Sequence, residues 1–254
     1  MLLELKDVTK KFGGITALSD MSFSVNQGDI FGIIGPNGAG KTTIFNMITG
    51  IYQVTSGDVL FNGTSIEGKK PYQIVDGGIA RTFQNIRLFG NMTVLENILV
   101  GHHSRMKEGL FGSVFHTKSM RQEEKEAVEE AHKLLQYVGL DDVADHTASE
   151  LPYGRQRKLE IARAMASHPQ LILLDEPAAG MNDSETAALI DLIRGIREQF
   201  NITIILIEHD MNLVMTLCNR LIVVNFGKKL AEGTPEEVQN NPAGIEAYLG
   251  KEDE

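Results

Sequence analysis

The chain has 254 residues, of which 42% are hydrophobic and 23% charged, a composition typical of an ordinary globular protein. This length fits one large domain, or one domain that carries an inserted lobe. The formal net charge of −10 argues against a nucleic-acid partner, because phosphate backbones need clustered Lys and Arg. The single cysteine, Cys218, excludes an internal disulfide and lies in an apolar stretch, so we expect a buried, reduced thiol.

No segment of the sequence is expected to cross a membrane. The longest strongly apolar runs, at 171–174 and 202–207, are far shorter than the roughly 18 residues that a transmembrane helix needs. The first residues alternate apolar and charged side chains, which is not the pattern of a signal peptide. We therefore expect any membrane contact to come through a partner protein.

The first sixty or so residues hold short segments of alternating polarity, at 2–8, 20–25 and 59–61. Turn signals accompany them at Gly13-Gly14 and Asn62-Gly63. Alternation with tight turns is typical of antiparallel strands. This part of the chain predicts a small antiparallel sheet that flanks the main one.

An apolar strand predicted at 29–34 runs into a glycine-rich loop, and a helix is predicted at 43–49. The loop matches the Walker A pattern G-x-x-x-x-G-K-[ST] in the strand-to-helix context that the pattern requires. Its residues, which we expect to bind phosphate groups, are Gly35, Pro36, Asn37, Gly38, Ala39, Gly40, Lys41, Thr42 and Thr43. Glycines let backbone N–H groups form an anion nest, to which the helix N-terminus adds its dipole. Lys41 supplies a positive charge for the β- and γ-phosphates, and the Thr42 hydroxyl is a ligand for Mg²⁺.

Residues from about 90 to 164 are mostly helical in pattern, and 123–138 is a charged amphipathic helix. We interpret this stretch as a helical lobe at 89–165, inserted into a core at 1–88 and 166–254. Within it, His102, His103 and His116 match no zinc-ligand spacing, so we interpret them as ordinary loop histidines.

Two carboxylates, Asp175 and Glu176, follow the apolar run at 171–174. Open α/β sheets bind ligands at the carboxyl ends of their strands. Asp175 is therefore a candidate Mg²⁺ ligand, and Glu176 a candidate base for an attacking water. His209 closely follows the next predicted strand, 202–207, and is a candidate sensor of the γ-phosphate. Unbroken apolar runs separated by a helical pattern at 184–199 predict an α/β fold with a mainly parallel sheet.

Two helix starts end the sequence. Thr234-Pro235 and Asn241-Pro242 each place a capping residue before a proline, and Gly250 closes the second helix.

These motifs, together with residues 151–164, carry a family resemblance. The segment that begins Leu151-Pro152-Tyr153-Gly154 resembles the signature region of ABC-transporter ATPases, usually written L-S-G-G-Q. The resemblance covers nearly the whole chain. At 78–84, 173–180 and 207–214 the chain is most similar to the branched-chain amino-acid uptake ATPases.

The resemblance implies a P-loop NTPase fold with a helical signature subdomain, and an enzyme that hydrolyses ATP with Mg²⁺. It implies that Phe12 stacks on adenine, and that Gln84 contacts Mg²⁺ and the water and links to the membrane subunit. Asn182 falls in the D-loop. The implied function is to power import of branched-chain amino acids through integral membrane subunits, from the cytoplasmic, inner face of the cell membrane.

The signature region departs from the family pattern. Pro152 replaces the usual Ser, Tyr153 the first Gly, and Arg155 the Gln, whereas Gly154 is retained. A helix is predicted at 156–166, and its N-terminal dipole would face a phosphate. The resemblance implies that this helix caps the ATP of a second protomer, so that two chains enclose two nucleotides head to tail.

The segment 85–92, after Gln84, is expected to be the docking loop for the membrane subunits, with Leu88 and Phe89 at its centre. Packing of both residues inside the chain is the alternative. For the whole protein, alternatives are the ATPase of a urea or lipopolysaccharide transport system, a soluble ABC ATPase, and a P-loop kinase. A single Walker A loop without extended heptads disfavours the soluble ABC ATPase, and the signature-like segment disfavours the kinase.

Overall fold

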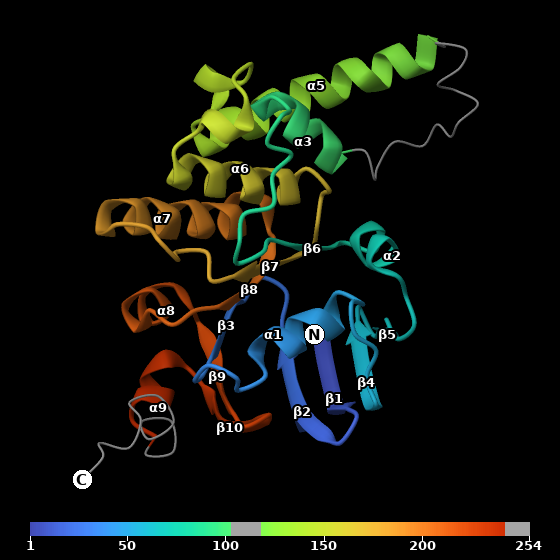
Figure 1. Ribbon diagram of the computed structural model, residues 1–254, viewed down its shortest axis with the longest axis vertical. Helices are drawn as coiled ribbons and strands as arrows, with labels where there is room; N and C mark the ends of the chain where they lie inside the picture. The colour runs from blue at the N-terminus through green and yellow to red at the C-terminus, as the bar shows by residue number, and fades with distance from the viewer. Residues whose placement is uncertain (103–117, 242–254) are drawn as a thin grey trace.

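The larger sheet has six strands in the order β10-β9-β3-β8-β7-β6 (Figure 1). The computed structural model describes residues 1–102 and 118–241. The strands are β3 (Ile30–Ile34), β6 (Ile79–Arg81), β7 (Leu171–Asp175), β8 (Thr203–Ile207), β9 (Arg220–Asn225) and β10 (Lys228–Gly233). All neighbours pair in parallel except β9 and β10. Every residue of β3, β7 and β8 is buried, which explains their unbroken apolar sequences and confirms the predicted parallel sheet.

The second sheet is antiparallel, in the order β2-β1-β4-β5. Its strands are β1 (Leu3–Phe12), β2 (Ile15–Val25), β4 (Ser56–Phe61) and β5 (Thr64–Ser65). The sequence predicted this sheet, but the predicted segments 2–8 and 20–25 were too short. Register shifts after Leu5 and Val8 break the alternation of polarity, so the outer half of the hairpin carries no clear pattern.

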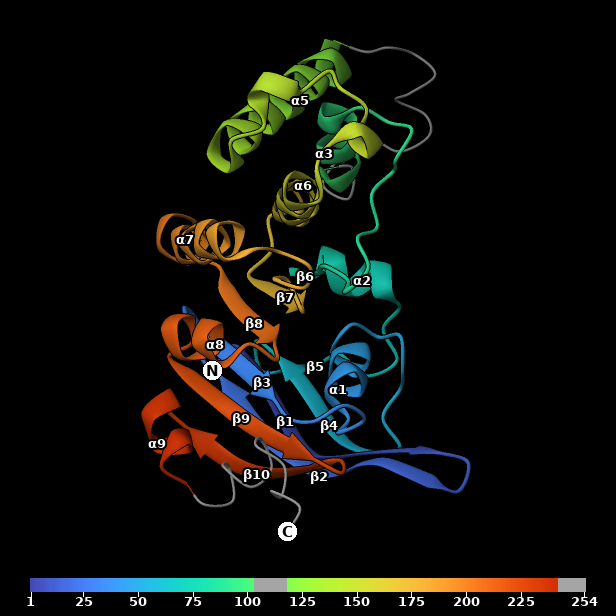
Figure 2. The ribbon, with the colours of Figure 1, turned by 60° about the vertical axis from the view of Figure 1, so that its left-hand side comes forward.

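Helix α1 (Lys41–Ile48) packs between the two sheets, where Ile44, Phe45 and Ile48 join one hydrophobic core. The other face of the large sheet is covered by helices, as Figure 2 shows. The helices on this face are α7 (Asp183–Phe200), α8 (Met211–Leu217) and α9 (Pro235–Gln239). Helix α2 (Pro71–Asp76) lies on the side of α1 and buries Ile74 in the same core. The predicted cap of α9 is confirmed, since the Thr234 side chain accepts from the Glu237 N–H. The second predicted C-terminal helix, beginning at Asn241-Pro242, lies outside the described residues apart from Asn241.

A layer of helices lies above the β7 end of the sheet in Figure 1. It contains α3 (Val94–His102), α5 (Lys118–Val138) and α6 (Tyr153–Met165), with short 3₁₀ turns at Asp141–Val143 and Ala148–Glu150. Ile98, Leu135 and Leu159 are fully buried in their shared core. None of the helices in the described part of the chain is long and apolar enough to span a membrane.

Three local expectations were wrong. Helix α6 begins at Tyr153 and not at 156, because Pro152 takes an extended conformation at its N-cap and the next residues form the first turn. His102 is helical, at the end of α3, and is not a loop residue; His103 and His116 lie outside the described residues. Leu88 and Phe89 do not share one environment, since Leu88 packs against the core while Phe89 is 49% exposed.

Cys218 is buried, as expected, and burial raises the pKa of its thiol to about 12.

Candidate active site

The glycine-rich loop joins β3 to α1 and is shaped by close packing. Gly35 has a φ of 146°, and a Cβ there would lie 1.9 Å from the carbonyl oxygen of Val224 on β9. Gly40, at the N-cap of α1, has a φ of 107°. The Gly227 N–H donates to the Ala39 carbonyl at 2.9 Å and fastens the β9–β10 turn to the loop. Only glycine fits positions 35 and 40, as the Walker A pattern requires.

Lys41 lies inside this loop with its side chain almost fully buried. Its ammonium group donates to the carbonyl oxygens of Gly35 at 2.7 Å and Pro36 at 2.9 Å. Burial lowers the pKa of Lys41, and the negative charges of Glu176 and Asp175 oppose that effect. The loop thus fixes a cation against two backbone carbonyls at the start of a helix, where an anion is favoured.

A cavity of about 650 Å³ opens over the loop. Its lining includes residues 37–43 of the loop together with Gln84 and Glu176, which come from distant parts of the sequence. Its apolar rim is formed by Ile15 and Phe226, which are 72% and 88% exposed. The volume is within the range of small-molecule sites. Phe226 belongs to no motif, and only the β9–β10 turn brings it here.

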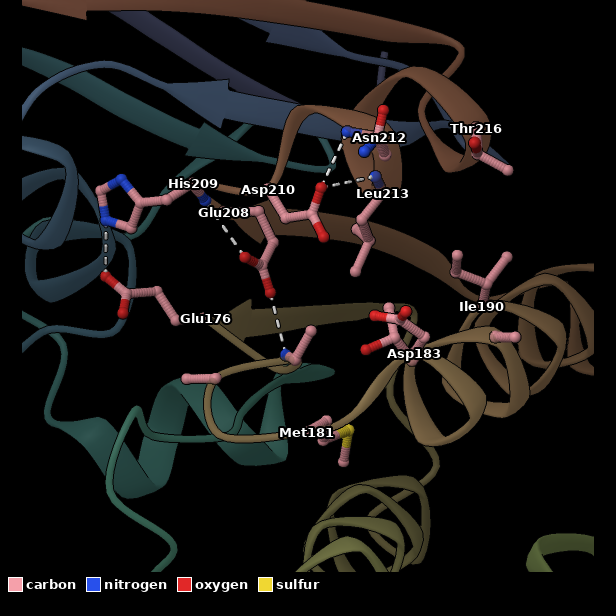
Figure 3. Close-up of a pocket in the computed structure, with 14 residues that line it drawn as sticks. Glu176, Met181, Asp183, Ile190, Glu208, His209, Asp210, Asn212, Leu213 and Thr216 are labelled. Atoms are coloured by element: carbon pink, nitrogen blue, oxygen red, sulfur yellow. Dashed lines mark hydrogen bonds and ion pairs between the residues drawn. The ribbon is translucent and has the colours of Figure 1, made fainter.

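Glu176 occupies the turn after β7 with a φ of 47°, an unusual backbone conformation for a residue with a side chain. One carboxylate oxygen accepts from Gln84 Nε2 at 2.7 Å. The other lies 2.9 Å from His209 Nε2, as Figure 3 shows. The Glu176 N–H donates to the carbonyl of Ile207 at 2.9 Å, which joins the ends of β7 and β8. The fold therefore brings together the three residues that the sequence singled out as catalytic candidates.

Asp175 ends β7 and is 5% exposed. One of its carboxylate oxygens lies 2.7 Å from Arg81 Nη2, and Arg81 also donates to Asn46 Oδ1 at 2.7 Å. The carboxylate of Asp175 and the hydroxyl of Thr42 are the hard oxygen donors that Mg²⁺ prefers, so these residues fit that ion chemically. No sequence motif identifies Arg81. Its position on a strand next to β7 was the only available signal, and β6 is just three residues long.

A buried ion pair between Arg157 and Glu160 holds the backbone around Gln84. No sequence motif identifies this pair. Arg157, on α6, is fully buried and donates to the carbonyls of Phe83 and Gln84, both at 2.7 Å. Glu160 accepts from Arg157 at 2.8 Å and from the Arg87 N–H at 3.1 Å. The helix that begins in the signature region therefore positions the Gln84 loop directly.

Glu208 joins the turns after β7 and β8 beside a second cleft of about 550 Å³ (Figure 3). Its carboxylate accepts from the backbone N–H groups of Ala178 at 2.9 Å and His209 at 3.1 Å. Burial raises the pKa of Glu208, and the backbone donors oppose that shift. Glu208 thus joins the segment that carries His209 to the segment that follows Glu176.

The signature residues do not line the cavity over the loop of their own chain. Tyr153 is 44% exposed, and Arg155 lies 3.3 Å from the carboxylate of Asp142. A Cβ on Gly154 would lie 2.8 Å from Glu185 Oε1 on α7. Glu185 and Asn182 form a capping box at the start of α7. The structure places Tyr153, Gly154 and Arg155 together at the N-terminus of α6, apart from the phosphate loop.

Phe12 also lies outside the lining of that cavity. It is 41% exposed and packs edge-on against Tyr52, with ring centroids 5.1 Å apart. The Lys10 ammonium lies 4.7 Å from the centroid of the same ring. Adenine stacking by Phe12 therefore stays a prediction.

Comparisons with known proteins give the class of this one. The ABC transporter family model matches residues 18–179. The chain belongs to this family and is an ABC ATPase that binds and hydrolyses ATP. A second model, for the branched-chain amino acid ATP-binding cassette transporter, matches residues 228–254.

Individual relatives are similar over nearly their whole length. The high-affinity branched-chain amino acid transport ATP-binding proteins LivG of Salmonella typhimurium and Escherichia coli are each 47% identical over 250 residues, or 98% of both chains. BraF of Pseudomonas aeruginosa, described in the same words, is 45% identical over 98% of both chains. The ADP conformation of an ATP-binding cassette of an ABC transporter aligns with a TM-score of 0.85 at 36% identity, covering 98% of this chain and 99% of the other.

Proposed function

We propose that this ATPase powers the import of branched-chain amino acids through partner membrane subunits. The observation that carries this proposal is the 47% identity over 98% of both chains to proteins that are named for that transport. The match of residues 228–254 to the branched-chain model supports it from a segment of the sequence that contains none of the ATP-site motifs. The proposal places the protein at the cytoplasmic face of the membrane, because ATP is available there.

We propose the following roles for the site residues, which the geometry around Lys41 and Glu176 supports. The loop at 35–43 binds the triphosphate, and Lys41 neutralises the β- and γ-phosphates. Glu176 accepts the proton of the attacking water. Gln84 and His209 hold the Glu176 carboxylate in place, at 2.7 and 2.9 Å. His209 also contacts the γ-phosphate. Phe12 stacks on the adenine ring.

Thr42, Asp175 and Gln84 would hold Mg²⁺. When bound, it neutralises charge on the β- and γ-phosphates. The contact between Asp175 and Arg81 holds that carboxylate in place at the end of β7.

Two copies of the chain, or this chain and a related one, form the active unit. The N-terminus of α6, with Tyr153, Gly154 and Arg155, caps the ATP of the opposite protomer. An exposed signature region that is separate from its own phosphate loop supports this arrangement. A dimeric post-hydrolysis ATP-binding cassette with ADP and phosphate, at a TM-score of 0.76 and 25% identity, gives a structural precedent.

Affinity purification of the tagged chain from detergent-solubilised membranes tests the assignment. We expect integral membrane subunits to co-purify and to make the ATPase respond to a leucine-loaded binding protein. A response to another solute, with none to leucine, isoleucine or valine, contradicts the proposed substrate. Recovery of the chain without any membrane subunit contradicts its role as a transport motor.

A further inference from the structure

Two histidines and a glutamate converge at the joint between the helical layer and the large sheet. His102 ends α3, Glu130 lies in the middle of α5, and His168 follows α6 just before β7. His102 Nε2 is 3.1 Å from one carboxylate oxygen of Glu130, and His168 Nε2 is 3.0 Å from the other. The two imidazole rings approach edge to face, with centroids 5.7 Å apart. Three segments that are distant in sequence thus direct nitrogen and oxygen donors to one point.

The geometry of these donors matches a transition-metal site. The three ligand atoms lie within 4.8 Å of one another. Zinc binds nitrogen and oxygen at about 2.0–2.2 Å, so the ligand atoms of a tetrahedral site are about 3.4 Å apart. Small rotations of the side chains therefore suffice to place an ion between them. Two imidazoles and one carboxylate are a known zinc ligand set, and one coordination position remains for water.

Burial and polarity also fit an ion. The side chain of His102 is 17% exposed, and those of Glu130 and His168 are 38% and 47% exposed, so the ion would have access from solvent. The Nδ1 atom of His102 is buried and has no hydrogen-bond partner among the described residues. The Nε2 atom, which faces Glu130, is therefore the ring nitrogen of His102 that would bind the ion.

We propose that His102, Glu130 and His168 bind one divalent cation of the zinc class. The ion links α3 and α5 to the segment that enters β7, whose far end carries Asp175 and Glu176. It therefore stabilises the attachment of the helical layer to the catalytic core. No sequence pattern identifies this site, because His168 is far along the chain from the other two residues and matches no known ligand spacing.

Titration with Co²⁺ tests the proposal, because tetrahedral Co²⁺ has a distinct visible absorption. The chain is freed of metal with a chelator and studied without ATP or Mg²⁺. We expect one Co²⁺ per chain, displaced by Zn²⁺. His168→Gln retains a hydrogen-bond donor towards Glu130 but removes the imidazole ligand, and should weaken binding at least about 100-fold. Zn²⁺ should raise the Tm of the native chain but not of this variant.

His132→Gln is the matched control. His132 also lies on α5 and pairs with a carboxylate, Asp141, at 2.7 Å, but without a second histidine. It should bind Co²⁺ like the native chain. His209→Gln should also retain binding, which separates this site from the ATP site. Absence of saturable binding below about 100 μM, or equal affinity in His168→Gln and the native chain, overturns the proposal. Circular dichroism establishes that each variant is folded before its affinity is compared.

Discussion

Glu176 shows how the fold positions a single reactive group. The backbone turns sharply after β7, and the side chain is then held from two sides, by Gln84 and by His209. Both contacts come from segments far away in the sequence, one after β6 and one after β8. A carboxylate with two fixed partners has little freedom to rotate, which is what positioning of a water molecule requires.

Glu176→Gln should retain ATP binding and lose turnover by about 10²–10⁴-fold, because an amide preserves the shape but cannot accept a proton. Fluorescent nucleotide binding and phosphate release measure the two effects separately. Glu198→Gln, at an exposed position on α7, is the control and should hydrolyse ATP normally. Near-normal hydrolysis by Glu176→Gln would reject Glu176 as the base.

At the scale of elements, α6 combines two roles. Its N-terminus presents the signature residues, and its second turn carries Arg157, which binds the backbone around Gln84. The helix is thus a rigid connection between the proposed dimer contact and the residue that contacts Glu176. We expect movement at one end of α6 to reach the other.

Arg157→Met tests this connection. It leaves Glu160 buried without its partner and should lower the free energy of unfolding by about 3–5 kcal/mol. Arg157→Met with Glu160→Met removes both charges and should recover much of that stability. Hydrolysis should stay low in the double variant, because the carbonyls of Phe83 and Gln84 still lack their donor. Thermal unfolding and phosphate release measure the two quantities, and recovery of both in the double variant would disprove the positioning role.

The signature contact is tested best at Arg155, since any side chain at Gly154 would meet Glu185 of the same chain. Arg155→Glu places a negative charge at the N-terminus of α6 and should weaken ATP-dependent dimerisation of the Glu176→Gln protein about tenfold or more. ATP binding by the monomer should be unchanged. Asp142→Ala breaks the exposed ion pair between Arg155 and Asp142 without adding a negative charge to α6, and this variant should dimerise normally. Size-exclusion chromatography with ATP distinguishes the cases; loss of monomer binding would place Arg155 in the site of its own chain.

How well the sequence predicts the structure differs from one element to another. Strands β3, β7 and β8 were predictable because burial on both faces leaves an unbroken apolar run. The loop at 35–43 was predictable because its chemistry is local in sequence. The partners Arg81 and Arg157 were not, because each acts through contacts with residues more than seventy positions away. A pattern along the chain carries no information about such contacts until the topology is known.

At the scale of the whole molecule, the chain must transmit the effect of ATP to another protein. The loop after Gln84 remains the proposed docking surface, with Phe89 as its most exposed large apolar residue and Leu88 partly buried against the core. Phe89→Ser should leave folding and ATP binding intact and abolish co-purification of membrane subunits. Leu230→Ser, at a similarly exposed apolar position on β10 at the opposite edge of the sheet, should co-purify normally. A large fall in Tm for Phe89→Ser would show that it packs within the chain.

The most direct test of the central claim is uptake of radiolabelled leucine into proteoliposomes that contain the co-purified membrane subunits, the binding protein and this ATPase. We expect uptake that requires ATP and this chain, that unlabelled isoleucine and valine compete with, and that Glu176→Gln abolishes. Leucine uptake of equal rate with the native chain and with Glu176→Gln would contradict the claim that this protein hydrolyses ATP to power branched-chain amino-acid import.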